Sequence, residues 1–434
     1  MKIAFIGAGS TMFAKNLFGD LMLLPAFDGF TASLHDIDPV RLQESTLLVE
    51  RLATLFGKKV KVESSLDRRK ALAGADYVIN AIQVGGYRPC TVTDFEVPKK
   101  YGLRQTIGDT LGIGGIFRAL RTIPVLEGIA HDMQEVCPDA YFLNYVNPMA
   151  ILTAYMLTQT GIRTVGLCHS VQVCVKELLT PIGMADKIPE HIEKIAGINH
   201  MAWLLELRDR EGNDLYPEVK RRCAMPETYD CGADLVRRDM MYRFGYYVTE
   251  SSEHTAEYHP YYIKSAYPEL IDRYRIPLDE YPRRCEQQIA DWEKQRDELL
   301  GGKLSHTLSR EYGAHIIAAL ETGEPYEFNG NVMNTGLIPN LPHGACVEVP
   351  VLADRAGFHP CYVGDLPEQC AALNRTNINV QLLTLRAALS KKREDVYMAA
   401  YLDPHTRAEL SLDDIRSLCD DLFEAHGDWL PAYH

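Results

Sequence analysis

The stretch that decides the fold is KIAFIGAGST, residues 2–11. KIAFI is an apolar run of strand length that stops at a glycine, and helical spacing of apolar residues follows as far as Leu24. A turn from strand to helix of this kind points backbone amides at a phosphate, helped by the helix N-terminus. Gly7 supports the tight turn and Gly9 allows close approach, while Ser10 and Thr11 open the helix. The stretch therefore predicts a dinucleotide-binding turn, although Met12 replaces the third glycine of the usual motif.

The rest of the first third alternates strands with helical patterns. Further strands are expected at residues 31–38, 60–65, 75–82, 140–148 and 163–168, and a helix at 39–56. Strands that alternate with helices predict a parallel, doubly wound, Rossmann-like sheet of the α/β class. Asp36 closes the second strand, where an acid binds the ribose hydroxyls, so the pattern favours NAD over NADP. Asp38 is a less well placed rival.

After about residue 190 the pattern changes. Residues 204–219 are expected to form two strands joined by a Gly-Asn turn, and residues 344–360 another strand-rich piece. Helices are expected at 278–300, 310–320 and 367–398. We therefore expect an NAD-binding domain over residues 1–190 and an α+β domain for substrate and metal over residues 191–434. Lactate and malate dehydrogenases share this layout.

The bulk composition narrows the class of protein. The chain has 434 residues and a net charge of −14 without a basic run, which argues against nucleic acid as a partner. No apolar stretch approaches the ~18 residues of a membrane span, and the N-terminus lacks a signal pattern. The 11 cysteines are scattered without a CxxC pair. A cytoplasmic protein, forming a homodimer or homotetramer, is expected.

Two short motifs offer a candidate metal site. VGLCHSVQ, residues 165–172, places Cys168 at the end of a predicted parallel strand, where such sheets bind ligands. AGINHMAW, residues 196–203, supplies His200. A thiolate and an imidazole, completed by substrate oxygens, suit Mn²⁺, Fe²⁺, Co²⁺ or Zn²⁺. On spacing alone, a buried core thiol and a hydrogen-bonded core histidine are the favoured explanation of the pair, since a free cysteine is usually buried.

These motifs together resemble glycoside hydrolase family 4. The blocks GAGST, GGYRPCTVTDF, DTLGIGGIFRALRTIP, LNYVNPMA, VGLCHSVQ, AGINHMAW and NTGLIPNLPHGACVEVP occur in the family's order along nearly the whole chain. Within the family, the resemblance is to bacterial α-galactosidases. It implies hydrolysis that depends on NAD and a divalent metal, with Mn²⁺ favoured: oxidation at C3 of the sugar, removal of the C2 proton, elimination of the aglycone, addition of water and return of the hydride.

The resemblance also implies roles for individual residues. Cys168 and His200 become the metal ligands, and a tyrosine of the segment 246–264 becomes the base. We expect Tyr258 in that role, with Tyr261 and Tyr262 as rivals. Many relatives carry an aspartate after the metal cysteine, where this chain has His169; a histidine there can protonate the leaving oxygen, bind the metal or contact substrate.

Substrate contacts and the identity of the sugar follow from the same comparison. Asn147 matches an Asn-Pro that contacts sugar hydroxyls, and Asp109 is a weaker candidate. Family members that cleave 6-phosphorylated sugars use a basic residue in the stretch after Gly86. Arg88 is present here, but Cys90 to Thr93 replace the arginine expected a few residues later, which favours an unphosphorylated α-galactoside such as melibiose or raffinose. An α-glucosidase, an α-galacturonidase and a plain NAD-dependent sugar or hydroxy-acid dehydrogenase remain alternatives.

Overall fold

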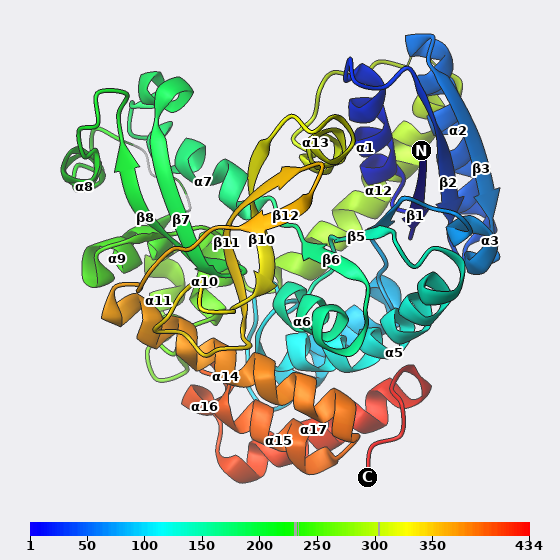
Figure 1. Cartoon of the computed structure of the whole chain (residues 1–434). Coiled ribbons are helices and arrows are strands. Elements are labelled where there is room, and N and C mark those ends of the chain that lie inside the picture. The colour runs from blue at the N-terminus through cyan, green and yellow to red at the C-terminus, as the bar shows by residue number, and fades with distance from the viewer. Residues whose placement is uncertain (230–231, 233, 303) are drawn as a thin grey trace.

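The computed structural model describes residues 1–229, 232, 234–302 and 304–434. Its strands join in one mixed sheet of 12 strands (Figure 1). The order across the sheet is β3-β2-β1-β4-β5-β6-β10-β11-β7-β8-β9, with β12 paired to β11. The strand bounds are β1 (Lys2–Ile6), β2 (Gly29–His35), β3 (Lys59–Ser65), β4 (Tyr77–Asn80), β5 (Tyr141–Asn144), β6 (Arg163–Gly166), β7 (Ile192–Ile198), β8 (Met201–Arg208), β9 (Tyr247–Val248), β10 (Tyr326–Met333), β11 (Cys346–Asp354) and β12 (Gly357–Pro360).

The half of the sheet from β3 to β6 is parallel throughout. Its order, 3-2-1-4-5-6, is that of a doubly wound dinucleotide-binding sheet, so the predicted Rossmann-like class is confirmed. Each of the six predicted strands lies at its expected place. β1, β4, β5 and β6 are short and mostly buried because helices cover both faces, whereas β3 at the edge of the sheet is polar and partly exposed.

Helices surround this sheet and fill the second half of the chain. Their bounds are α1 (Thr11–Leu23), α2 (Pro39–Phe56), α3 (Arg68–Leu72), α4 (Val92–Lys99), α5 (Gly112–Val136), α6 (Met149–Gln159), α7 (Ser170–Leu179), α8 (Tyr216–Cys223), α9 (Leu235–Phe244), α10 (Ser252–Glu257), α11 (Glu269–Arg273), α12 (Glu280–Gly301), α13 (Gly313–Thr322), α14 (Glu368–Ser390), α15 (Arg393–Leu402), α16 (Thr406–Glu409) and α17 (Leu412–His426). Short helical turns are η1 (Gly86–Thr91), η2 (Ala185–Glu190) and η3 (Gly427–Trp429).

The remaining strands extend the same sheet with antiparallel pairs. β10 pairs with β6 and β11, β11 with β7, and β7 with β8. The two parts of the chain share their interior, since one apolar cluster includes Ile3 of β1 and Ile378 of α14. The C-terminal helices α14 and α15 also pack on α5, and so return the chain to the parallel half of the sheet, as the lower part of Figure 1 shows.

The structure corrects the predicted hairpin at residues 204–219. β8 is its first strand, but the second is reduced to one bridge between Arg208 and Asp214, after which α8 begins. The side chain of Asp209 accepts hydrogen bonds from the amides of Glu211 and Asn213 and so closes the turn early. Pro217 in the first turn of α8 then favours a helix over a strand.

The C-terminal helical stretch also differs from its prediction. It is broken between Ser390 and Arg393, where Lys391 has a positive φ of 56°, and α17 was not predicted at all. Ser411 caps α17 by accepting a hydrogen bond from the amide of Asp414, so the signal for this helix was present in the sequence.

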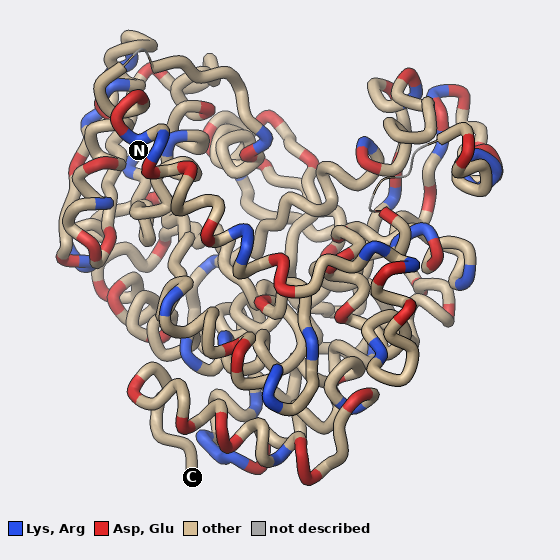
Figure 2. Tube along the Cα trace, turned by 180° about the vertical axis from the view of Figure 1, so that it is seen from behind, with Lys and Arg blue, Asp and Glu red and all other residues tan. Residues whose placement is uncertain are grey.

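Charged residues of both signs alternate along the trace (Figure 2), which agrees with the absence of a basic run from the sequence. Of the helices in the described ranges, none is both long and apolar enough to cross a membrane.

Candidate active site

Three side chains from separate parts of the chain converge beyond the parallel sheet. Cys168 follows β6, His200 lies in the turn between β7 and β8, and Glu250 follows β9. One ligand atom from each of them, the thiol sulfur, an imidazole nitrogen and a carboxylate oxygen, lies within 4.8 Å of the others. The structure therefore brings the predicted pair Cys168 and His200 together and adds a carboxylate. Sulfur, nitrogen and oxygen donors in one cluster suit a divalent transition metal.

The cluster is electrostatically coupled. Burial alone would lower the pKa of His200, but the charges of Cys168 and Glu250 outweigh burial and raise it to about 10. Burial alone would raise the pKa of Glu250, but His254 and His200 lower it to about 2. The backbone of His200 has a positive φ of 63°, which is uncommon for a residue with a side chain and marks a constrained turn. The site thus places a thiol, an imidazole and a carboxyl group close together, with His200 buried and Cys168 and Glu250 partly exposed.

Tyr258, at the end of α10, adjoins this cluster. Its hydroxyl lies 3.0 Å from Nδ1 of His200. Burial, with the carboxylates of Glu257 and Asp109, raises the pKa of Tyr258 well above its usual value. The rivals lie elsewhere: the hydroxyl of Tyr262 donates to Asp239, and Tyr261 is half exposed and stacks on Phe244. Of the three tyrosines, Tyr258 has the contact to His200.

Asp109 and Asn147 lie together as the sequence analysis expects. The amide of Asn147 donates to Asp109 Oδ2 over 3.4 Å, and the guanidinium of Arg118 in α5 lies 3.8 Å from the same oxygen. Arg118 also donates to the backbone oxygen of Asn147, which precedes a cis proline. These groups form a polar surface of hydrogen-bond donors and acceptors that can bind sugar hydroxyls.

The loop that carries Asp109 is held by Glu257, the residue before Tyr258. The carboxylate of Glu257 accepts hydrogen bonds from the successive amides of Thr106, Ile107 and Gly108 over 2.8–3.3 Å. Burial nevertheless raises the pKa of Glu257 to about 7, against the lowering effect of these amides. Glu257 contacts the loop that carries Asp109, and Tyr258 contacts His200, so these neighbouring residues connect the two parts of the site.

His169 points away from the cluster in this structure. Its Nε2 lies 2.7 Å from a carboxylate oxygen of Glu311, just before α13. The rings of Tyr145 and Tyr312 flank it at centroid distances of 5.8 and 6.1 Å. Its side chain is 44% exposed, so it stays accessible to a ligand. Within the described ranges it has no hydrogen bond to Cys168, His200 or Glu250.

The nucleotide turn has the geometry that its sequence predicts. Gly7 has a φ of 89°, and a Cβ there would lie 2.7 Å from the backbone of Ala81. The amide of Gly9 donates to Asp36 Oδ2 over 2.6 Å, and a Cβ on Gly9 would strike the same oxygen. Ser10 is exposed at the start of α1, and the Thr11 hydroxyl accepts from Ser45. Asp38 instead caps α2, where it accepts from the amides of Val40 and Arg41. Asp36, not Asp38, is thus beside the turn.

Sequence reasoning missed Glu250, Glu257 and Arg118 as site residues. Glu250 and Glu257 fall in the segment 246–264 that the sequence analysis selects, in which no local pattern separates a ligand from a packing residue. Their contacts, to His200 and to the loop at Thr106–Gly108, connect residues far apart in the chain. Only a three-dimensional structure brings such partners together.

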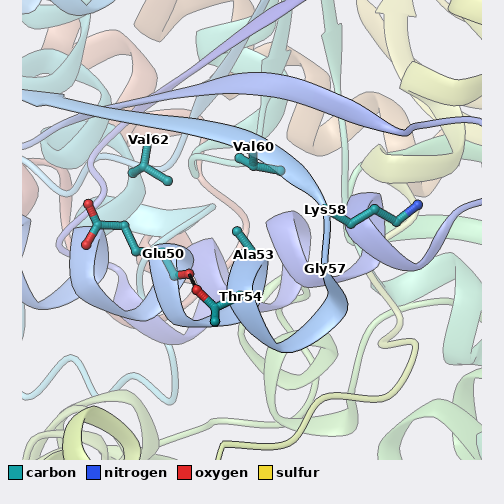
Figure 3. Close-up of a pocket in the computed structure, with 7 residues that line it drawn as sticks. All are labelled: Glu50, Ala53, Thr54, Gly57, Lys58, Val60 and Val62. Atoms are coloured by element: carbon teal, nitrogen blue, oxygen red, sulfur yellow. Dashed lines mark hydrogen bonds between the residues drawn. The ribbon is translucent and has the colours of Figure 1, made fainter.

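Surface hollows lie away from this cluster. One of about 390 Å³ lies between α2 and β3 (Figure 3) and is lined by Glu50, Ala53, Thr54, Gly57, Lys58, Val60 and Val62, none of which is a candidate site residue. Another, of about 370 Å³, lies among α7, α13 and the start of β10. Neither hollow is lined by Cys168, His200 or Glu250. The candidate site is therefore identified by its cluster of metal-binding side chains and not by the shape of the surface.

Known proteins are similar to this chain over its whole length. An α-galactosidase of Bacillus subtilis is 63% identical over 433 residues, covering 100% of this chain and 99% of its own. An α-galactosidase of Rhizobium meliloti is 34% identical, covering 100% and 89%. Several α-galacturonidases and an α-glucosidase are 28–30% identical.

Solved structures show the same fold. A Bacillus subtilis protein described as a glucosidase superposes with a TM-score of 0.85 at 27% identity, covering 97% of this chain and 99% of that one. A 6-phospho-α-glucosidase from gut microorganisms, solved in complex with NAD and Mn²⁺, has a TM-score of 0.79 at 20% identity and covers 100% and 99%. A malate dehydrogenase of Plasmodium falciparum shares the layout at a TM-score of 0.54 and 14% identity, covering 90% and 99%.

Family profiles complete the comparison. The profile described as family 4 glycosyl hydrolase matches residues 2–184, and the profile of that family's C-terminal domain matches residues 195–406. With a full-length relative at 63% identity, these matches confirm the resemblance drawn from the sequence motifs: the chain belongs to glycosyl hydrolase family 4.

Proposed function

We propose that this protein hydrolyses α-galactosides of the melibiose and raffinose type, using NAD that is recycled in each turnover. The observation that carries the proposal is the cluster of Cys168, His200 and Glu250 beside Tyr258 in a dinucleotide-binding fold. An α-galactosidase at 63% identity supports the choice of sugar. The substrate is accordingly a small carbohydrate, and nucleic acid and membrane are not partners.

The residues around the first turn fit a dinucleotide. Gly7 and Gly9 occur where a Cβ would collide with Ala81 and Asp36, so only glycine fits a turn of the kind that approaches a pyrophosphate. Ser10 and Thr11 open α1, whose N-terminus favours an anion. Asp36, at the end of β2, is the acid for the ribose hydroxyls. We assign these five residues to NAD.

The donor set fits a divalent metal, with Mn²⁺ as our choice. Cys168 and His200 would hold the ion, and Glu250 offers a third donor. Bound NAD⁺ would accept a hydride from C3 of the sugar and later return it, and a bound divalent ion would stabilise negative charge on the sugar oxygens.

The chain's own side chains move the protons. Tyr258 would accept the C2 proton at its phenolic oxygen in the ionised form, and the positive charge of a cation held at the cluster would favour that form against the burial and the carboxylates of Glu257 and Asp109 that raise the pKa of Tyr258. The hydrogen bond to His200 fixes the direction of that oxygen. His169 donates a proton to the departing glycosidic oxygen after its side chain turns from Glu311 toward the substrate. Asn147 and Asp109 bind sugar hydroxyls and so orient the ring.

The proposal is tested with a panel of p-nitrophenyl glycosides, assayed with and without NAD⁺, Mn²⁺ and EDTA. We expect the α-galactoside to be cleaved fastest, only with both additions, and without net formation of NADH. Preference for the α-glucoside or α-galacturonide would select the corresponding alternative within the family. NADH formed in proportion to product would instead identify a dehydrogenase. Either of these two results would overturn the proposal.

Three further points belong to the same proposal. We assign an NAD-binding domain to residues 1–190 and a substrate and metal domain to residues 191–434, a division supported by the profile matches at 2–184 and 195–406. Cys168, His169, Asn147 and Asp109 reach the site from the first of these domains. Cysteines of the described residues such as Cys90, Cys174 and Cys419 are free thiols, which fits a reducing, cytoplasmic environment. The working form is proposed to be a homodimer or homotetramer, which light scattering with size-exclusion chromatography measures directly.

A further inference from the structure

Four residues form one continuous rung across the middle of the sheet. Asn331 of β10 pairs with Gly166 of β6 on one side and with Glu348 of β11 on the other, and Glu348 pairs in turn with Gly197 of β7. Within the described part of the chain, each outer junction consists of a single registered pair. The rung therefore joins the parallel half of the sheet to the strands of the second half, at the centre of Figure 1.

The outer strands of the rung lead directly to the two metal candidates. Cys168 follows Gly166 by two residues, and His200 follows Gly197 by three. Both glycines are tightly packed: a Cβ on Gly166 would lie 2.5 Å from the Thr153 hydroxyl, and one on Gly197 would lie 2.8 Å from Ala202. Because the strands cannot shift freely against these neighbours, the rung fixes where each of them delivers its ligand.

The two inner residues of the rung are unusual for the core of a sheet. Asn331 and Glu348 are both fully buried, and the amide of Asn331 donates to Glu348 Oε1 over 3.0 Å and to the backbone oxygen of Gly166 over 3.4 Å. A buried carboxylate costs stability unless a charge or hydrogen bonds compensate it. Local violations of this kind are expected at functional sites.

Hydrogen bonds and charges compensate Glu348 only in part, since within the described residues its Oε2 has no hydrogen-bond partner. Burial raises the pKa of Glu348 to about 7, and the positive charge of His200 and the amides of Asn331 and Asn199 act against it. Asn199 directly precedes His200 in the turn after β7. Glu348 thus pairs with the strand that leads to the imidazole, while its partner Asn331 holds the strand that leads to the thiol.

We infer that Glu348, with Asn331, is a positioning residue for the metal site: through its pairing with Gly197 it holds the strand that leads into the Asn199–His200 turn, and it places a carboxyl group behind that turn. Groups that orient metal ligands from behind commonly change metal affinity by roughly 10–100-fold when they are replaced. This inference rests on the metal site of the proposed function, and it adds a residue that touches neither metal nor substrate.

The test is the metal affinity of the full-length Glu348→Gln variant, which keeps the side-chain shape and removes the charge. We expect Mn²⁺ to bind roughly 10–100-fold more weakly by calorimetry, and the thiolate-to-Co²⁺ absorption of the Co²⁺-loaded protein to weaken or shift. Glu44→Gln is the matched control, since Glu44 is another buried glutamate but lies in α2 and bonds to Arg296 of α12. This control should bind Mn²⁺ as the wild type does.

Two outcomes would overturn the inference. One is a folded Glu348→Gln variant with Mn²⁺ affinity and a Co²⁺ spectrum within twofold of wild type. If that variant does not fold, Asn331→Ala removes the amide that donates to Glu348 Oε1, and unchanged metal affinity there overturns the inference as well. Metal binding is measured without any glycoside, so a wild-type protein that binds Mn²⁺ but cleaves no α-galactoside would refute the proposed function alone.

Discussion

Nδ1 of His200 lies 3.0 Å from the hydroxyl oxygen of Tyr258, and the two rings are nearly parallel, with an interplanar angle of 17°. This contact joins a metal candidate to the proposed base. The other nitrogen, Nε2, faces Glu250 at 3.4 Å, so the ring lies between the donor cluster and the base. A change at either end of this chain of contacts should affect the other end.

Replacing Tyr258 by phenylalanine should abolish proton removal and leave binding intact. General-base catalysis commonly contributes about 10²–10⁴-fold, so we expect kcat to fall by that factor with little change in Mn²⁺ affinity. Exchange of deuterium from D₂O into C2 of the released galactose should be lost in parallel. Tyr262→Phe is the control, because that hydroxyl donates to Asp239 instead. Full activity in Tyr258→Phe would refute the assignment.

Removing a donor from the cluster should remove the metal. We expect Cys168→Ser and His200→Ala to lose stoichiometric Mn²⁺ by elemental analysis, and Glu250→Gln to bind it at least about tenfold more weakly. Cys361→Ser is the matched control, since Cys361 is exposed and follows β12, outside the cluster. The assignment fails if the Cys168 and His200 variants keep both metal and hydrolysis.

The role of His169 can be separated from binding by the choice of leaving group. A p-nitrophenolate leaves without help, whereas the sugar alkoxide of melibiose needs a proton. His169→Ala should therefore lose about 10²–10⁴-fold in kcat/KM on melibiose and far less on p-nitrophenyl α-galactoside. Glu311→Gln keeps an oxygen for the hydrogen bond to His169 and should change both rates less than His169→Ala does. Equal losses of His169→Ala on the two substrates would show that it does not act as the acid.

Asp36 and Asp38 offer a matched pair for the cofactor. Asp36 adjoins the Gly9 amide, whereas Asp38 caps α2. Hydrogen bonds to a charged group contribute about 1.5–3 kcal/mol, so Asp36→Ala should weaken NAD⁺ binding by roughly 10–100-fold in fluorescence titration. Asp38→Ala should cost about 1 kcal/mol of stability through the lost helix cap and leave NAD⁺ binding unchanged. A larger loss of NAD⁺ affinity in Asp38→Ala than in Asp36→Ala would instead assign the ribose contact to Asp38.

The sequence predicted the parallel half of the fold because its signals are local. The apolar run before Gly7 defines β1, and the adjacent residues Asp38 and Pro39 define the start of α2. Both signals lie next to the element that they define. The hairpin after β8 was predicted wrongly, because the carboxylate of Asp209 closes the turn early and the chain then enters α8. Such side-chain capping competes with strand pairing and is not visible in a hydrophobic pattern.

The candidate site was predictable only in part. Cys168 and His200 stand in recognisable motifs, so the sequence could name them before any geometry was known. Glu250, Glu257 and Glu348 were not identified, since a glutamate in a strand or loop usually faces solvent. Their burial depends on partners distant in the chain, such as Asn331 for Glu348, and only the assembled sheet shows it.

The pKa of Glu257 makes the site sensitive to pH. In the folded protein, burial raises this pKa to about 7, whereas an unfolded glutamate titrates at about 4.3. A raised pKa contributes stability that is fully present below about pH 4 and is lost as pH rises through about 7, at up to about 1.4 kcal/mol per pH unit. The wild type's temperature of half-unfolding minus that of Glu257→Gln should therefore decrease as the pH is raised from 5 to 8.

The sign of this effect distinguishes Glu257 from a carboxylate in the opposite situation. Burial would raise the pKa of Glu409, but hydrogen bonds from Ser265 and Lys264 lower it below its usual value. Both states of Glu409 are thus ionised above about pH 5, and the difference between wild type and Glu409→Gln should stay constant from pH 5 to pH 8. A constant difference for Glu257→Gln as well would mean that its three backbone amides keep the Glu257 carboxylate ionised throughout. In that case Glu257 would act as a permanent anchor for the loop that carries Asp109, and activity would not respond to its protonation.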